Sequence, residues 1–271
     1  MAVRKKKIRV QDRELCKEKC KPYEERIKQA LAAEKEVLAT IKQDEAQLPY
    51  KKFKLSEDML SIAADYMQIN NLAVELIAAK NNDALNDARK IIYKSIIYLE
   101  EIVTPTVDVA YNEIEDKVSQ IADISVEKRY YLVRKLGLTI QLLEDAFGEN
   151  SKWKMSFIEI HGRAAVVTKN LLDWKQASKV YFDSTLPEYD NTMYYIRLVR
   201  KLLDQSSTQH RDKYELSTHR VDDMRLAIQF VLAERRICIA LSEAEDAEKL
   251  KSKAQVWKDK LDAEKKKGVA K

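Results

Sequence analysis

Apolar residues recur along this chain at intervals of three and four for almost its whole length. This interval places them on one face of an α-helix, whereas a half-buried strand would alternate apolar and polar residues at every second position. The longest regular run lies at 153–174, where the intervals follow the order 4-3-4-3-4-3. No segment alternates convincingly enough to predict a strand. The pattern therefore predicts an all-α protein.

Helix ends are predicted from capping residues and polar breaks in these stripes. Ser56, Ser125 and Ser151 are suited to N-caps, and Thr104-Pro105 is suited to an N-cap and first helical residue. The polar stretch 206–219 favours a surface loop or a short helix. The predicted helices cover about 23–47, 56–80, 85–102, 104–121, 125–147 (with Gly148 at its C-terminal end) and 152–182, then a segment around Tyr195–Leu202, and Val221 to about Lys267.

The arrangement of these helices is predicted from their spacing and from the connections between them. Stripes that stay near a 3.5-residue repeat favour long helices at shallow crossing angles. Glycine and proline, with four residues each, are scarce, so the connections should be short. We expect a bundle of about seven or eight long antiparallel helices. It forms one domain at 10–248, between a basic tail at 1–9 and a basic amphipathic helix or tail at 249–271.

The motif content speaks against several common kinds of active site. The glycine-rich phosphate loops GxGxxG and GxxxxGK[ST] are absent, as is the GxSxG nucleophile elbow. No glutamate stands three residues before a histidine, as ferritin-like di-iron bundles require. We predict no cofactor, no metal ligand and no catalytic residue. An enzyme whose groups meet only in the fold remains an alternative.

The cysteines offer the clearest candidate for metal or redox chemistry. Cys16 and Cys20 stand four residues apart in CKEKC. A structural zinc needs four ligands, and no second pair of similar spacing follows. We interpret them as small residues on an exposed lysine-rich segment, with a redox pair as the alternative because lysines can lower a thiol pKa. Cys238, on an apolar stripe, is expected to be buried, and His161 is expected at the core or its boundary.

Tyrosines interleaved with cations could stack on nucleic-acid bases. The best example is Lys128-Arg129-Tyr130-Tyr131. Tyr130 falls on the apolar stripe of its helix, and the arginines and lysines are expected on the opposite, solvated face. We therefore favour packing over base stacking.

Positive charge is concentrated at the two ends of the chain. The first nine residues carry +5 and residues 249–271 carry +6, whereas the whole chain carries +5, leaving −6 for residues 10–248. Basic ends suit an anionic surface: nucleic acid, a ribosome, an acidic protein patch or an anionic membrane. The alternative is that these ends are simply solvated.

A narrow apolar stripe runs through the lysine-rich C-terminal segment. A helix this polar needs something to cover its stripe. The cover could be the chain's own body, a coiled-coil partner or second copy, or, less favourably, an anionic membrane surface. We predict that Trp257 anchors another chain, because tryptophan is enriched among interface hot spots. The stripe consists of Ala247, Leu250, Ala254, Trp257 and Leu261.

These features favour a non-catalytic helical interaction or scaffold protein. The alternative is a nucleic-acid- or ribosome-associated factor held by phosphate contacts. We expect a cytoplasmic location, because there is no apolar run of about 18 residues and no signal-peptide core after the basic start. The predicted partner-binding residues are Arg4, Lys5, Lys6, Lys7, Arg9, Leu250, Trp257, Leu261, Lys265, Lys266 and Lys267.

Overall fold

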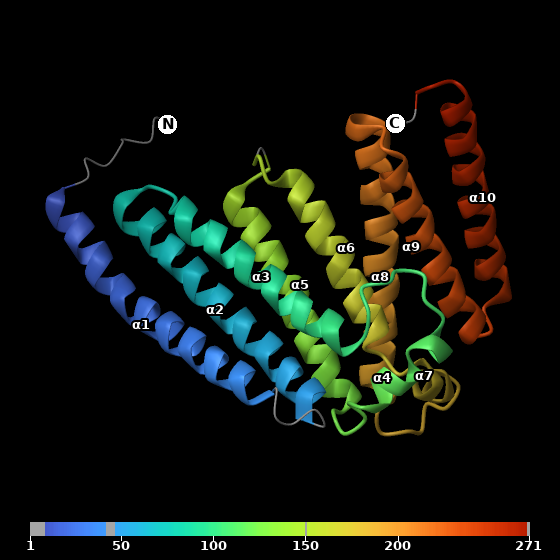
Figure 1. Ribbon diagram of the computed structural model, residues 1–271, viewed down its shortest axis with the longest axis horizontal. Coiled ribbons are helices and arrows are strands. Elements are labelled where there is room, and N and C mark those ends of the chain that lie inside the picture. The colour runs from blue at the N-terminus through green and yellow to red at the C-terminus, as the bar shows by residue number, and fades with distance from the viewer. Residues whose placement is uncertain (1–8, 42–46, 150, 270–271) are drawn as a thin grey trace. The chain divides into compact units, whose positions relative to one another are not determined.

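The computed structural model describes residues 9–41, 47–149 and 151–269 (Figure 1). Within these residues all regular structure is helical, which confirms the all-α prediction. The α-helices are α1 (Val10–Ile41), α2 (Leu48–Ile77), α3 (Asn82–Ile102), α4 (Glu115–Ser119), α5 (Val126–Phe147), α6 (Lys154–Asn170), α7 (Trp174–Tyr181), α8 (Tyr189–Lys213), α9 (Val221–Ala240) and α10 (Ala244–Lys266), with a 3₁₀ turn at Tyr111–Glu113 and a π-helical turn at Tyr214–Thr218.

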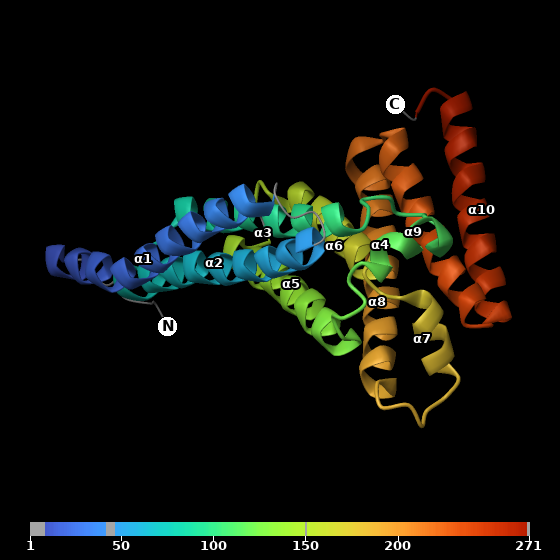
Figure 2. The ribbon, with the colours of Figure 1, turned by 60° about the horizontal axis from the view of Figure 1, so that its bottom comes forward.

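The chain divides into two compact units, one of residues 1–98 and 138–151 and one of residues 99–137 and 152–271. The division falls inside α3 and inside α5. In the first unit α1 lies alongside α2, and in the second α9 packs between α8 and α10, as both views show (Figures 1 and 2). The single domain expected at 10–248 stays a prediction. In the described part of the chain, no helix has the length and apolarity needed to cross a bilayer.

α1 begins well before its predicted start, because Pro22 lies inside the helix and does not precede it. An interior proline removes one backbone hydrogen bond and crowds the preceding turn. Cys16 and Cys20 before it, and Ile27 after it, are buried in one apolar cluster with residues of α2. The burial of apolar residues on both sides of Pro22 thus outweighs the lost hydrogen bond and the crowding at the proline. α1 starts at Val10.

α2 also starts earlier than predicted, at Leu48 with proline in its first turn. Ser56 was expected to cap this helix, but it lies inside the helix and is fully buried. Its hydroxyl is 2.8 Å from that of Ser95 on α3, and Ser95 Oγ also donates to the Ser56 carbonyl at 3.0 Å. In the sequence alone, a serine that makes a buried hydrogen bond between helices cannot be told from a serine that caps a helix.

The helix predicted at 104–121 is wrong. Only the 3₁₀ turn and the five-residue α4 form there. The Asn170 side chain donates to the carbonyls of Thr104 (2.9 Å) and Thr106 (3.2 Å), which fixes the segment after Pro105 in a non-helical path. The apolar stripe nevertheless faces inward. Its buried members are Val107, Ile114, Val118 and Ile121.

Two long predicted helices are each divided. The segment 152–182 stops at Asn170 and restarts at Trp174, where Asp173 caps α7 by accepting a hydrogen bond from the Gln176 N–H at 3.0 Å. The segment 221–267 turns after α9, and Ser242 takes the left-handed φ of 59° before α10. Each division lets the apolar stripe continue after a change of direction.

The polar stretch 206–219 is helical and partly buried, which corrects the expectation of a loop or short helix. α8 continues to Lys213 and the π-helical turn follows directly. Ser206, Ser207 and His210 are buried on it. Small polar side chains therefore allow α8 to be covered by neighbouring helices although its composition is hydrophilic.

α6 packs tightly against α8 at Gly162. His210 is 4% exposed and stacks on Phe230 of α9, with ring centroids 5.5 Å apart. A Cβ on Gly162 would lie 2.9 Å from His210 Nε2 and 3.3 Å from Phe230 Cζ. Burial, followed by the charge of Lys213, lowers the pKa of His210 to about 4, so the imidazole is neutral at pH 7. The ring is a packing element held against a glycine.

We expect Gly162→Ala to lower the free energy of unfolding by about 1–3 kcal/mol, the usual cost of overpacking a core. Gly137→Ala is the matched control, because a Cβ there meets no heavy atom within 4 Å and the residue lies inside α5. It should stabilise the protein by about 0.5–1 kcal/mol through helix propensity. Urea unfolding of both variants measures the contrast. Equal effects of the same sign would show that the α6–α8 contact is not tight.

Candidate functional site

The predicted N-terminal partner-binding residues lie almost entirely outside the described part of the chain. This applies to Arg4, Lys5, Lys6 and Lys7. Arg9 is described, and its side chain is exposed just before α1. Its backbone N–H donates to Asp12 Oδ2 at 3.0 Å, which ties the first turn of the helix to this residue.

The C-terminal apolar stripe is covered by the chain itself. Trp257 and Leu261 are 8% and 3% exposed, and they share a core cluster with Met224, Ala227 and other residues of α9. Leu250 is half-buried against the same cluster. The sequence left three alternatives for what covers this apolar stripe, and packing against the chain's own body was one of them. Partner binding by these residues stays a prediction, and it would require α10 to leave α9.

The charge of α10 is close to balanced. Because the helix begins at Ala244 and not at residue 249, it includes three further carboxylates near its N-terminus, where the helix dipole favours negative charge. Over its full length it carries seven lysines and six carboxylates. The added carboxylates are Glu245, Asp246 and Glu248.

Several of the α10 lysines also have partners within the chain. Lys253 Nζ is 3.1 Å from Asp204 on α8, and Lys260 Nζ is 2.7 Å from Glu215 in the π-helical turn. Such exposed pairs contribute little stability, about 0–1 kcal/mol each, but they reduce the positive field that an anion would meet. The exposed lysines predicted to bind a partner lie at the end of the helix: Lys265, Lys266 and Lys267.

The two cysteines of CKEKC are not exposed, which corrects that interpretation. Cys16 and Cys20 are 8% and 6% exposed and face the apolar cluster of α1 and α2. Burial, followed by the neighbouring Cys16, raises the pKa of Cys20 to about 11. This is opposite to the lowering that a reactive thiol needs. Both residues therefore act as small apolar side chains.

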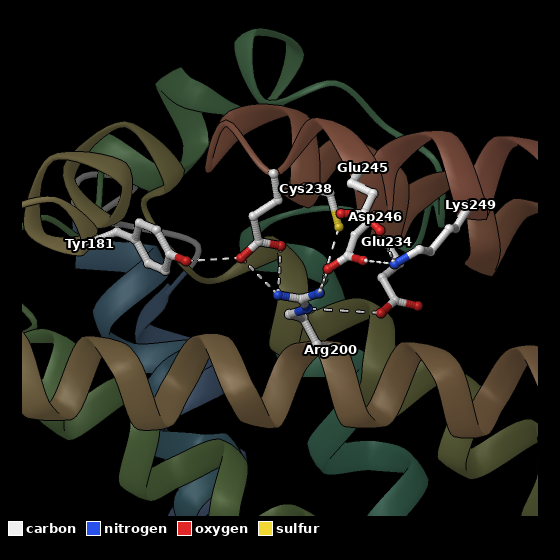
Figure 3. A network of polar contacts seen from close by, with 8 residues as sticks. Tyr181, Arg200, Glu234, Cys238, Glu245, Asp246 and Lys249 are labelled. Carbon is white, nitrogen blue, oxygen red and sulfur yellow. Dashed lines mark hydrogen bonds and ion pairs between the residues drawn. The ribbon is translucent and has the colours of Figure 1, made fainter.

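A polar network joins α8 to the turn between α9 and α10 (Figure 3). Arg200 on α8 places Nη1 at 3.0 and 2.8 Å from the two carboxylate oxygens of Glu243. Tyr181, at the end of α7, donates its hydroxyl to the same carboxylate at 2.9 Å. Glu243 thus receives hydrogen bonds from two different helices. These bonds from α7 and α8 fix the position of the turn between α9 and α10.

Around Arg200 lie two further acidic groups and a thiol (Figure 3). Its Nε is 3.9 Å from Glu234, and its Nη2 is 3.8 Å from Asp246 and 3.7 Å from the Cys238 sulfur. Burial raises the pKa of Glu234 to about 7, and burial raises the pKa of Cys238 to about 11. Cys238 is buried as expected, and it stays a thiol at neutral pH. The thiolate required for nucleophilic chemistry is therefore disfavoured here.

Arg129 does not lie on a solvated face, which corrects another expectation. It is 5% exposed and donates to the carbonyls of Ile124 (2.9 Å), Leu171 (2.9 Å) and Ile121 (2.5 Å). Leu171 is the C-cap of α6. A buried guanidinium that binds carbonyls at chain turns satisfies acceptors left open where helices end. Arg129 is thus a structural cation.

One face of α5 presents large apolar side chains to solvent. Leu138 and Leu142 are 55% and 58% exposed and stand one helical turn apart in the part of α5 that belongs to the first unit. Tyr131, which is 53% exposed, belongs to the second unit. Tyr194 of α8, itself exposed, stacks on Tyr130 with ring centroids 6.3 Å apart. We call Leu138 and Leu142 the α5 face.

A buried lysine lies at the C-terminal end of α6. Lys169 is 5% exposed, and its Nζ donates to the Val109 carbonyl over 3.4 Å. Burial lowers the pKa of this amine to about 8, while nearby Asp108 opposes the shift. Asp108 is itself bound by the guanidinium of Arg236 on α9. Lys169 lines a cavity in the second unit.

A model of the TP0443 family matches residues 12–265. The chain belongs to the TP0443 family. The match runs from the first turn of α1 almost to the end of α10, so it includes the stripe that docks on α9 and leaves out residues 1–11. No curated protein and no solved structure matches the chain.

For this TP0443 family member, sequence reasoning missed the α5 face and Lys169. Leu138 and Leu142 stand beside the buried Ile140 and Leu143, and apolar residues on two sides of a helix were available as a signal. Lys169 stands in the apolar run AAVVTKNLL. A lysine within such a run is rarely solvated, since lysines are seldom buried unless paired. That signal was present in the sequence.

Proposed function

We propose that this protein is a non-catalytic, cytoplasmic helical interaction or scaffold protein that binds another protein through the α5 face. The exposure of Leu138 and Leu142, each more than half accessible and one helical turn apart, carries the proposal. Single exposed apolar residues are ordinary on protein surfaces. Two large apolar residues on successive turns of one helix are typical of a face that another apolar surface covers.

In the second unit, a cluster of aromatic side chains offers a further surface of the kind that protein partners cover. Tyr130 contacts Tyr131, with centroids 5.9 Å apart, and stacks on Tyr194 from α8. Tyrosine is enriched in protein interfaces because it buries a large area with few rotatable bonds and keeps a polar tip. The ring cluster is anchored to two helices, so it loses little conformational freedom when a partner covers it.

The basic ends have a supporting role in this proposal. Exposed Arg9 and the terminal lysines of α10 would attract an acidic partner surface and speed association more than they add affinity. The near balance of charge on α10 makes a phosphate-only contact through this helix the weaker alternative. A nucleic-acid- or ribosome-associated factor is the second candidate, and the experiment below separates the two.

We expect Leu138→Glu combined with Leu142→Glu to abolish capture of the protein partner by the purified, tagged chain. Both side chains are already exposed, so the free energy of unfolding should change by no more than about 0.5 kcal/mol. Capture is performed from nuclease-treated lysate in about 1 M salt, where the Debye length is about 3 Å and charge contacts are screened. Mass spectrometry of the bound fraction gives the result.

The matched control places the same charges elsewhere. Leu216 and Val256 are 83% and 64% exposed on other elements of the chain, and their double change to glutamate should leave capture intact. Equal capture by wild type and the α5 variant would overturn the proposal. Capture that disappears with nuclease or salt would favour the nucleic-acid alternative.

A further inference from the structure

A small cavity of about 280 Å³ lies in the second unit beside Lys169. Its walls come from the segment that includes Val109 and Ile114, from Trp174 at the start of α7, and from Ile237 and Ala240 on α9. Drug-sized ligands occupy pockets of about 300–1,000 Å³, so this cavity suits a smaller molecule. Apart from Lys169 and Arg236, its walls are mainly apolar or aromatic side chains.

The Lys169 ammonium is poorly satisfied for a buried charge. It has three hydrogens to donate, and the structure gives it one long bond, to the Val109 carbonyl at 3.4 Å. Among the described residues no carboxylate lies within 4.0 Å of its Nζ. The nearby acidic group is Asp108, which the guanidinium of Arg236 already binds. A buried cation is normally paired, and here the described residues place no carboxylate within ion-pair distance of the ammonium.

We propose that this cavity binds a small organic carboxylate, with one carboxylate oxygen bonded to Lys169 Nζ and an apolar body against Ile114, Trp174 and Ile237. The cavity is lined by none of the residues of the α5 face, so this inference goes beyond the proposed function. The lowered pKa of Lys169, about 8, agrees with an amine that lacks its anion. Even so, most of the population is protonated at pH 7 and can form the ion pair.

The composition of the walls selects the class of ligand. A phosphate group is normally held by several donors, such as a helix N-terminus or an arginine fork. Here the buried cation in the lining is the single ammonium of Lys169, whereas the Arg236 side chain is half-exposed and bonds Asp108 through Nε. One cation beside apolar walls matches a monocarboxylate with a short hydrocarbon body. Bonding to this carboxylate also replaces the water that a lone ammonium would otherwise need.

Hexanoate binding to the full-length protein, measured by calorimetry, tests this inference. We expect saturable binding of hexanoate and at least tenfold weaker binding of hexanol, which has the same hydrocarbon body without the charge. Lys169→Met should abolish hexanoate binding. Lys175→Met is the matched control, because Lys175 is an exposed lysine of α7 paired with Glu115 at 2.9 Å, and it should bind hexanoate as wild type does.

A second variant keeps the test independent of the lysine. Ala240 is exposed at the end of α9 and lines the cavity, so Ala240→Trp should fill the mouth and block hexanoate while Lys169 stays in place. The inference is overturned if wild type binds no hexanoate at millimolar concentration, if hexanol binds equally well, or if Lys169→Met binds hexanoate unchanged. Loss of binding in both variants, with native circular dichroism, supports it.

Discussion

Replacing Trp257 with alanine should lower the free energy of unfolding by about 3–5 kcal/mol, the range typical of large aromatic residues removed from a core. Trp257 is 8% exposed and packs with Met224 and Val231 of α9. The Arg211 guanidinium and the Lys253 ammonium lie 5.5 and 4.9 Å from its ring centroid, which adds cation–π attraction. Urea unfolding followed by circular dichroism measures the loss.

The neighbouring Val256 provides the control, because it is 64% exposed on the same helix. Val256→Ala should change the free energy of unfolding by about 0.5 kcal/mol or less. The Trp257 result also separates two roles for α10. If Trp257→Ala leaves stability unchanged but reduces self-association or partner capture, α10 docks on another chain, and the intramolecular packing described above is not its main contact.

The helical fold could be predicted because helix periodicity is a local property of the sequence. α5 is the clearest case, since its predicted range 125–147 agrees with Val126–Phe147. Gly148 follows it with a φ of 84°, a left-handed conformation that ends helices and favours glycine. Where the cap, the stripe and the terminating glycine agree, no distant contact is needed to place the helix.

Helix ends could not be predicted where a distant side chain decides them. Ser56 has the residue type of an N-cap, but its hydroxyl bonds to Ser95 on another helix. Thr104-Pro105 has the residue types of a helix start, but the Asn170 side chain binds carbonyls of this segment and holds it in a non-helical path. These partners stand tens of residues away, so a pattern read along the chain does not contain them.

The candidate sites were hidden for a related reason. The net charge of the C-terminal segment was counted from residue 249, whereas α10 begins at Ala244. The count therefore left out the carboxylates in the first turns of the helix, and the segment had a higher net positive charge than the whole helix has. For Lys169, the sequence shows a lysine in an apolar run. It does not show that Asp108 is already bound by Arg236. That arrangement arises only when α6, α9 and the segment between α3 and α4 meet.

Replacing Lys169 with methionine should raise the free energy of unfolding at pH 7 by about 2–3 kcal/mol. Burial lowers the pKa of this amine from the usual 10.5 of a lysine to about 8. At about 1.4 kcal/mol for each pKa unit, that shift corresponds to a cost of about 3–4 kcal/mol for burying the charge. Losing the bond to the Val109 carbonyl offsets about 1 kcal/mol of the gain. Methionine fills nearly the same volume without a charge.

The gain should disappear as the pH rises, and this distinguishes desolvation from simple repacking. Below about pH 8 Lys169 is protonated in both the folded and the unfolded chain, so the folded chain bears the full cost of burying the charged ammonium. Between about 8 and 10.5 the unfolded chain binds a proton that the folded chain has lost, so wild-type stability from this residue rises with pH. Above that window both forms are neutral and the cost is gone.

The measurement is urea unfolding of wild type and Lys169→Met at pH 7 and again near pH 10, where the difference should be much smaller or reversed. Other groups titrate alike in both proteins and cancel in the difference. Lys175→Met, at an exposed ion pair worth about 0–1 kcal/mol, should give no gain at either pH. A Lys169→Met variant that is destabilised equally at both pH values would mean that the protein satisfies this ammonium by itself. The open bonding capacity assigned to a carboxylate ligand would then not exist.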